Sequence, residues 1–402
     1  MSFLKKLNSL GPGLLFAATA IGVSHLVQSS RAGAEYGYQL IGVVVLANLF
    51  KYPFFEYGTR YAAVTGKSII DGYSKIGKWF LVVFLILNFT TMFTVAAAVS
   101  LVTAGIIQAI LPFETNINVV TGLLLFSSVG LLWKGKFTLL EKGIKWMALI
   151  MLLTTLLAFI LSLFVTESPS SSTFKNVPSL PFIIALMGWM PTALDISTWN
   201  SLWTVEKMKK EKFDLKAAKF DFNFGYIFTA VLAVVFLILG ARVMSSSELP
   251  DSAVGYSNVF LSMFTSTLGN WSWPIIAAAA FTVMLSTTIT VLDGYSRAVS
   301  HTASLIRIRN ENEKSIYRLT LLVLGCGASV LLFFYGGSLA TMVNIATIIS
   351  FLIAPVIAVV NLLMVKGYSF PENDKPKKGM FYLSLAGIVF LIGFSIVYLI
   401  NL

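Results

Sequence analysis

Charged side chains, cysteine and histidine are all scarce in this sequence. Charged residues make up 12 % of the 402 residues, whereas hydrophobic residues make up 57 %. This balance excludes an ordinary soluble domain. The single cysteine, Cys326, excludes an intrachain disulfide, and it lies inside an apolar run, so it says nothing about the redox compartment.

Several short motifs that carry chemistry are also missing. There is no phosphate-binding GxxxxGK[ST] loop, which argues against a primary ATP-driven pump, and there is no HExxH, CxxC or GxSxG. No nucleophile–base or metal-dyad spacing takes their place. The sequence therefore predicts no enzyme and no bound cofactor.

Apolar runs of about twenty residues recur along the chain and predict an all-α polytopic membrane protein. Two lysines precede the first run as in a signal peptide, but no small-residue cleavage site follows, so we expect this segment in the mature protein. We expect eleven spans, at roughly 12–33, 37–57, 79–111, 117–133, 143–165, 180–203, 223–244, 271–297, 316–335, 339–365 and 379–401.

Basic residues are distributed unevenly between alternate loops, which predicts the orientation. With the N-terminus in the cytoplasm, all of the 29 Lys and Arg residues except Arg31, Lys175 and Arg242 fall on the inner side. Lys51 and Arg60 count here as inner residues at the end of the second span. An odd number of spans then places the C-terminus outside the inner or plasma membrane.

The net charge of +11 is explained by these loops and does not indicate nucleic acid. The expected partners are the lipid bilayer and a small ion or small-molecule substrate. The sequence does not define an oligomeric state.

The sixth predicted span is interrupted in its middle. Gly188 and Pro191 break the helical pattern, and Asp195 follows with no Lys or Arg nearby in the segment. Proline removes a backbone donor and frees a carbonyl one turn back. Freed backbone groups and a bare carboxylate at membrane depth persist only beside protein or a wet cavity. The segment therefore predicts a discontinuous helix that lines a substrate site.

The first predicted span is interrupted as well. Its apolar part, from Leu14 to Ile21, is too short to cross a hydrocarbon core of about 30 Å. The next ten residues, from Gly22 to Arg31, include a histidine, a glutamine and three serines. We expect two half-helices that meet near Gly22 and His25.

The two interrupted spans each begin a block of five spans, at about 12–165 and 180–365. Because the number of spans in a block is odd, the second block must be inverted relative to the first. Interrupted helices at matching positions in two halves indicate a secondary transporter with an inverted repeat and a site near the membrane midplane. The chain is then one transmembrane domain with an extra helix at about 379–401.

Asp195 is the strongest candidate for a site residue, because an unpaired carboxylate inside a span is costly. The alternative is that it accepts hydrogen bonds from Ser197, Thr198 or a freed backbone N–H. Near the same break, the thioether of Met190 is a possible soft metal ligand, and the carbonyl of Met187 is a further ligand.

His25 lies at the break in the first span, where a ligand role and a structural role are equally open. Ser24 and Gln28 are weaker candidates beside it. Other polar residues carry less signal. We expect Asp293 to pair with Arg297 at helical spacing and Glu35 and Glu56 to be solvated, whereas His301, past the eighth span, carries no signal.

The motifs Gly11-Pro12-Gly13-Leu14-Leu15, 32–38 (AGAEYGY) and 60–67 (RYAAVTGK) resemble those of the Nramp family of divalent-metal transporters. Met190-Pro191 resembles that family's MPH segment, and 287–290 (TTIT) resembles its STIT. The resemblance covers most of the chain in span number and spacing. It implies a LeuT-like fold of two inverted five-span repeats, with discontinuous helices 1 and 6, which carries a divalent metal by alternating access.

This sequence differs from the family at the positions where the family has its metal-binding and proton-route residues. The DPGN motif aligns with 22–25 (GVSH), so the metal-binding aspartate and the asparagine are absent. The MPH histidine becomes Thr192, and a second histidine becomes Ser197. The acidic pair of the family's proton route aligns near Val99 and Val102. Proton coupling by that route is therefore not expected.

A desolvated dication needs anionic or strongly polar ligands, which one thioether and one carbonyl do not supply. Two substrates stay open: a divalent metal at a relocated site formed by Met190, Asp195 and His25, or a small organic solute independent of metal. A non-transporting receptor or scaffold is a third possibility. The residues expected at the substrate are Gly22, Ser24, His25, Gln28, Met187, Met190, Thr192 and Asp195.

Overall fold

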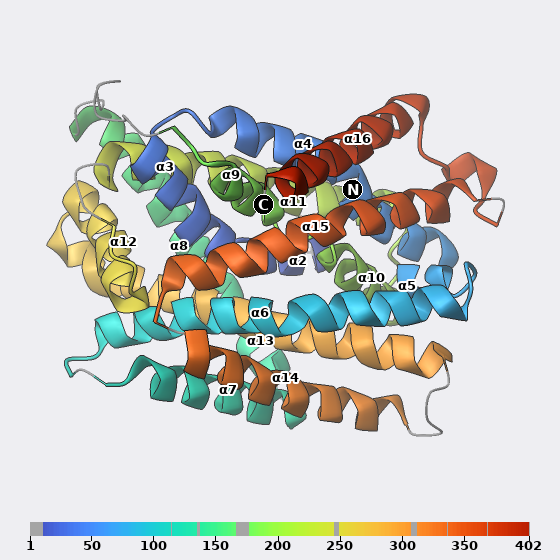
Figure 1. Ribbon diagram of the computed structural model, residues 1–402, viewed down its shortest axis with the longest axis horizontal. Helices are drawn as coiled ribbons and strands as arrows, with labels where there is room; N and C mark the ends of the chain where they lie inside the picture. The colour runs from blue at the N-terminus through green and yellow to red at the C-terminus, as the bar shows by residue number, and fades with distance from the viewer. Residues whose placement is uncertain are drawn as a thin grey trace.

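A computed structural model shows a bundle of helices whose long members run side by side along the molecule (Figure 1). It describes residues 11–113, 115–134, 137–165, 177–244, 249–306, 312–335, 337–367 and 369–401, with the backbone alone for 137–148 and 165. The basic residues Lys5, Lys6, Lys136, Lys175, Arg307 and Arg309, which were used to predict the orientation, lie outside this description.

The helices of the first half begin with α2 (Pro12–Ala20), the π-helical turn η1 (Ser24–Ser29) and α3 (Ser30–Tyr36). They continue with α4 (Ile41–Thr65), α5 (Ile69–Tyr73), α6 (Lys78–Ile110), α7 (Ile117–Trp133) and α8 (Phe137–Val165).

The second half contains α9 (Leu180–Gly188), α10 (Ile196–Lys210), α11 (Leu215–Leu239), the π-helical turn η2 (Gly240–Met244), α12 (Ala253–Leu268), the short turn η3 (Asn270–Ser272), α13 (Trp273–Ile306), α14 (Glu313–Tyr335) and α15 (Leu339–Lys366). The turn η4 (Glu372–Asp374) and α16 (Lys378–Ile400) follow.

Six helices of the described residues are long and apolar enough to cross a membrane, and a seventh span forms if the bent pair 12–20 and 24–36 counts as one. Two shorter apolar helices, Ile117–Trp133 and Leu149–Phe164, fall within predicted spans. The chain is therefore a multi-pass membrane protein. The number of eleven spans and the orientation stay predictions.

Both predicted interruptions are present. The first helix ends at Ala20 and resumes at Ser24 with a bend of 43°. Ser24 donates its hydroxyl to the carbonyl of Ala20, which competes with regular helical bonding at this point. The sixth helix ends at Gly188 and resumes at Ile196. We call the intervening residues 189–195 the helix 6 break.

Helices that occupy equivalent places in the two halves pack against each other: α4 on α11, α6 on α13 and α7 on α14. Figure 1 shows α6, α13 and α14 running together along the long axis. This pairing is what two inverted repeats produce around a common axis. It places the two interrupted helices between the halves, in contact with α4, α11, α13 and α15.

The GPG motif at the start of α2 is explained by close packing on α11. Asp221 of α11 accepts the backbone N–H of Gly11 at 2.9 Å and that of Gly13 at 2.7 Å. A carboxylate is favoured at the N-terminus of a helix, where N–H groups lack intrahelical partners. A side chain on Gly13 would overlap the backbone carbonyl of Asp221.

The structure corrects the predicted placement of three charged residues. Lys51 is not an inner-loop residue: it lies inside α4 and is fully buried. Glu56 is not solvated but 1 % exposed, and it pairs with Arg60 at 2.7 Å and with Lys219 at 3.6 Å. Arg60 is likewise buried within α4. The expected pair of Asp293 and Arg297 is present at 2.7 Å.

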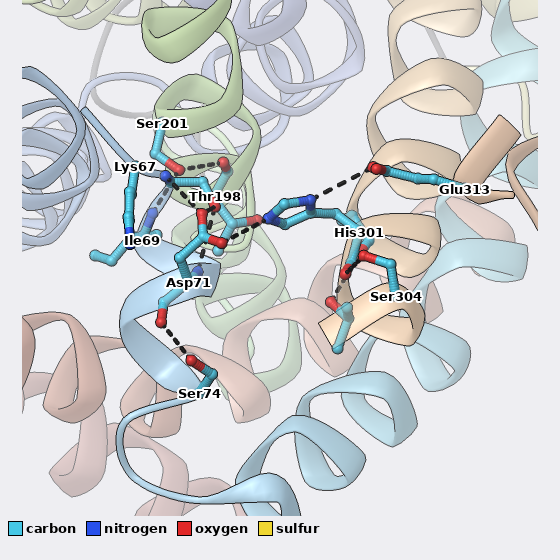
Figure 2. A network of polar contacts seen from close by, with 12 residues as sticks. Lys67, Ile69, Asp71, Ser74, Thr198, Ser201, His301, Ser304 and Glu313 are labelled. Atoms are coloured by element: carbon cyan, nitrogen blue, oxygen red, sulfur yellow. Dashed lines mark hydrogen bonds and ion pairs between the residues drawn. The ribbon is translucent and has the colours of Figure 1, made fainter. Parts of the chain in front are cut away.

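His301, for which no role was expected, connects three helices (Figure 2). Its Nε2 lies 3.2 Å from Asp71 of α5, and its Nδ1 lies 3.4 Å from Glu313 of α14. Burial alone would raise the pKa of Asp71, but hydrogen bonds from His301 and Ser68 lower it below its usual value. Asp71 is therefore ionised at neutral pH and helps to fix the short helix α5, which the hydrophobic pattern did not reveal.

The predicted orientation determines which positions of the chain a membrane-impermeant thiol reagent can reach from outside the cell. In a Cys326→Ser background, Asn401→Cys should react in intact cells, whereas Lys67→Cys should react only after permeabilisation, because the two exposed positions are expected on opposite sides. Mass spectrometry of the labelled protein measures both. The reverse pattern would contradict the orientation deduced from Lys and Arg.

The close approach of α2 and α11 predicts a position-specific effect of adding one methyl group. Gly13→Ala should lower the free energy of unfolding by about 1–3 kcal/mol, because α2 must move away from α11. Gly42→Ala is the matched control, since a side chain at Gly42 of α4 meets nothing within 4 Å. Thermal unfolding in detergent compares the two, and equal melting temperatures would contradict the packing.

Candidate functional site

The ammonium group of Lys51 lies at the end of α9, beside the helix 6 break. Its Nζ donates to four backbone carbonyl oxygens at 2.9 to 3.0 Å. We call this set the carbonyl cage: the oxygens of Met187, Gly188, Met190 and Thr192. The side chain of Lys51 crosses from α4 to reach it and has no exposed surface.

The sequence of the break explains why these carbonyls are free. The last carbonyls of a helix have no intrahelical partner, and they carry the negative end of the helix dipole. Pro191 has no N–H to offer, and the Met190–Pro191 peptide bond is cis. Locally, the carbonyl of Met187 accepts the N–H of Trp189 and, at 3.3 Å, the N–H of Met190. The ammonium of Lys51 satisfies the acceptors that the backbone leaves open.

Asp195 lies at the other end of the break, directly before α10. Its Oδ2 accepts the hydroxyl of Tyr295 of α13 at 2.8 Å. Its Oδ1 is buried and has no hydrogen-bond partner among the described residues. Since a buried carboxylate oxygen is normally bonded, this oxygen is available to a ligand. Of the alternative donors, the backbone N–H groups of Asp195 and Ile196 do interact with the carboxylate, although Oδ1 completes no hydrogen bond with the described residues. The hydroxyl of Thr198 donates to the backbone carbonyl of Asp195 instead.

Asp195 lines a small cavity of about 30 Å³, which we call the Asp195 cavity. This volume suits one water molecule or one small ion. Hydroxyl groups from the first, sixth and eighth predicted spans border it, on Thr19, Ser24, Thr192 and Thr287. The rest of the lining is mostly apolar, with Val99, Ile196 and Trp199 among its residues. The charges of Asp195 and Lys51 attract each other across the break.

His25 is fully buried and engaged on both sides of its ring. Its Nδ1 lies 2.9 Å from the carbonyl of Ala20 and 2.8 Å from the hydroxyl of Ser24, and its Nε2 lies 2.9 Å from the carbonyl of Thr229 on α11. His25 does not border the Asp195 cavity. These contacts correspond to the structural role and tie the break in the first span to α11.

Met190 and Gln28 do not border the Asp195 cavity. The sulfur of Met190 accepts a weak hydrogen bond from Ser29 at 3.8 Å. The amide nitrogen of Gln28 donates to Thr347 of α15 at 3.4 Å, and its amide oxygen is buried without a partner among the described residues. The described residues contain no group of three or more His, Cys, Asp or Glu side chains able to hold a metal.

The structure therefore divides the expected substrate residues into groups. Ser24, Thr192 and Asp195 come together at the Asp195 cavity, and Gly22 lies next to it, against Thr287. The carbonyl of Met187 is occupied by Lys51. The three metal ligands suggested for a relocated site, Met190, Asp195 and His25, do not line one cavity.

Sequence reasoning missed Lys51, Tyr295 and Thr19 as site residues. Lys51 had a usable signal, since a charged residue inside an apolar segment is functional by default. The count of basic residues hid that signal by assigning Lys51 to the end of a span. Tyr295 and Thr19 had none, because tyrosine and threonine are ordinary within membrane helices.

Comparison with known proteins shows which family this chain belongs to. The family model described as "Natural resistance-associated macrophage protein-like" (Nramp) matches residues 13–401. An uncharacterized protein of Pasteurella multocida (strain Pm70) is 36 % identical over 409 residues, covering 98 % of this chain and 92 % of that protein.

Solved structures agree on the fold. Two variants of the manganese transporter of Eremococcus coleocola superpose with TM-scores of 0.71 and 0.70 at 15 % and 16 % identity. Each comparison covers 99 % of this chain and 87 % of the solved one. The chain belongs to the Nramp family and has its LeuT-like fold. Because members of this family are membrane transporters of metal ions, the chain is a transporter and not an enzyme.

The bond from Tyr295 predicts a cost for removing one hydroxyl. Tyr295→Phe leaves Oδ2 of Asp195 buried without a donor, so the free energy of unfolding should fall by about 1–3 kcal/mol. Tyr382→Phe is the control, because Tyr382 of α16 is 65 % exposed. Thermal unfolding measures both, and a melting temperature of Tyr295→Phe equal to that of the control would show that the bond does not hold Asp195.

Proposed function

We propose that this chain carries a divalent metal cation across the membrane by alternating access, through a non-standard site at the Asp195 cavity. The observation that carries the proposal is Oδ1 of Asp195, a buried carboxylate oxygen that has no hydrogen-bond partner among the described residues. Asp195 borders an ion-sized cavity lined by residues of both broken helices. Transporters of this architecture bind their substrates at such breaks.

The donor atoms around the cavity indicate the kind of cation. A carboxylate and the hydroxyls of Thr19, Ser24 and Thr192 are oxygen ligands, which suit Mg²⁺, Mn²⁺ or Ca²⁺ better than soft metals. Asp195 is the one charged residue on the described lining, so a cation held here would keep part of its water, which requires the cavity to widen beyond the about 30 Å³ of this structure. Relatives of the same fold include a manganese transporter, which supports a metal as the substrate.

The polar residues of the cavity are buried in this structure, since Ser24, Thr192 and Asp195 are only 4 to 7 % exposed. Substrate entry and exit therefore require the half-helices α2 and α9–α10 to move relative to α6 and α13. In our proposal, the closed cavity is an occluded state between two open ones. Val99 borders the cavity and Val102 lies one turn along α6, and neither side chain can carry a proton, so protons do not follow the acidic pair of the family.

One observation favours a second candidate, a metal-independent carrier of a small organic solute. Lys51 already places a positive charge at the break, where it attracts the charge of Asp195. A dication then meets less attraction than an isolated carboxylate would provide.

Calorimetry on the purified protein with Mn²⁺, Mg²⁺ and Ca²⁺ tests the metal site. The wild type should bind at least one of these ions, and Asp195→Asn should weaken that binding by about 30-fold or more, because losing a buried charged partner costs about 2 kcal/mol or more. Asp293→Asn is the matched control, since Asp293 is bonded to Arg297 and Tyr317 and does not border the cavity.

Counterflow in proteoliposomes separates the remaining possibilities. A metal carrier exchanges labelled metal across the membrane, whereas a carrier of an organic solute does not. Absence of heat for all three ions in the folded wild type would contradict the metal proposal and favour the organic solute. Equal binding by Asp195→Asn and wild type would show that the cation binds elsewhere.

A further inference from the structure

The carbonyl cage has the composition of a cation site. Four uncharged oxygens surround Nζ of Lys51 at 2.9, 2.9, 3.0 and 3.0 Å. Rings of backbone carbonyls at membrane depth replace the hydration shell of a monovalent cation in the same way. An ammonium has three N–H groups, so the cage offers one more acceptor than the ammonium can bond singly. The four oxygens therefore surround the ammonium as they would surround a spherical monovalent cation.

The position of the cage explains its affinity for positive charge. Met187 and Gly188 are the last residues of α9, where the helix dipole is negative. The carbonyls of Met190 and Thr192 come from the unwound segment on either side of Pro191 and turn toward the same point. A cation here joins the end of α9 to the segment that leads to α10, and thereby fixes the shape of the helix 6 break.

A lysine used only to fill space would be an expensive choice. Burying an ammonium costs several kcal/mol unless its partners compensate, whereas a methionine or leucine fills the same volume without that cost. The side chain of Lys51 is 0 % exposed and ends in the cage with all its polar contacts on backbone oxygens. The charge itself is therefore what the position requires.

We propose that the carbonyl cage is a monovalent-cation site that the ammonium of Lys51 fills permanently. Lys51 is then a positioning residue that replaces a free K⁺ or NH₄⁺-sized ion, and it keeps the carbonyl of Met187 from binding the transported substrate. The proposal goes beyond the transport activity and does not depend on which substrate the Asp195 cavity takes. It predicts that a shortened side chain turns the cage into a site for ions from solution.

The test measures thermal unfolding of Lys51→Ala, Lys51→Met and wild type in KCl, NH₄Cl, methylammonium chloride and choline chloride at equal ionic strength. Lys51→Ala opens the cage, so its melting temperature should be lowered in choline and raised by several degrees in K⁺ or NH₄⁺. Lys51→Met fills the space with an uncharged chain of similar length. It should be destabilised to the same extent in every salt.

Wild type and Lys78→Ala, a variant at the exposed start of α6, are the controls and should not distinguish the four cations. Counterflow of the labelled substrate in proteoliposomes should follow the same pattern. Lys51→Ala should transport the substrate better in K⁺ or NH₄⁺ than in choline, whereas Lys51→Met should show no such difference. This cation selectivity is a signature that a lysine with a packing role alone would not produce.

The proposal is overturned if Lys51→Ala unfolds identically in choline and in K⁺ or NH₄⁺, or if it fails to fold in all four salts. It is also overturned if Lys51→Met is as stable as wild type, because the charge would then be dispensable. None of these results depends on metal binding. A failure of the metal proposal, seen as absent heat in the wild type, is thus distinguishable from a failure of this one.

Discussion

The contact between Lys51 and the carbonyls of the helix 6 break is the constraint on which the site depends. An interrupted helix inside a membrane exposes backbone oxygens that lipid cannot satisfy. In this chain a single ammonium from α4 bonds four of them. These contacts fix the unwound segment, and Asp195 lies at its far end. Removing that contact would leave the break without a defined shape.

The first interrupted helix is fixed by different means. Its N-terminal half is held on α11 by Asp221, and its break is tied to the same helix through His25 and the carbonyl of Thr229. The two breaks thus have separate anchors, one on α4 and one on α11, which are equivalent helices of the two halves. The Asp195 cavity lies between the anchored elements, so relative movement of the halves alters the cavity directly.

Much of this arrangement was predictable from the residues. Gly188 and Pro191 indicated the break in the sixth span, the polar run from Gly22 to Arg31 indicated the one in the first, and Asp195 stood out as a costly charge. The helices α5 and α12 were not predicted, because they are too short or too polar to be recognised as spans. The carbonyl cage was not predicted, because it depends on a tertiary contact between residues 136 or more positions apart in the sequence.

The positive-inside rule and the rule for intramembrane charges gave opposite interpretations of Lys51, and the structure decides between them. A lysine in a loop adds to the orientation signal, whereas a lysine inside a helix marks a functional position. Lys51 follows an apolar run and precedes Pro53 and Glu56, a pattern that is also typical of a span end. The burial of Arg60 and Glu56 was missed for a similar reason, because their pairing within α4 cannot be inferred from composition.

The charges at the break also bear on how such a carrier releases its cargo. A transport site must bind its substrate well enough to select it and weakly enough to let it leave. An isolated buried carboxylate holds a dication tightly, but the attraction between Lys51 and Asp195 reduces the field that a cation meets in the cavity. Where the family's motif supplies an aspartate and an asparagine, this chain supplies hydroxyls and a balanced charge. In our two proposals, a fixed internal cation and a buried carboxylate oxygen act together: the scaffold keeps its broken helices, and the substrate is held weakly enough to leave.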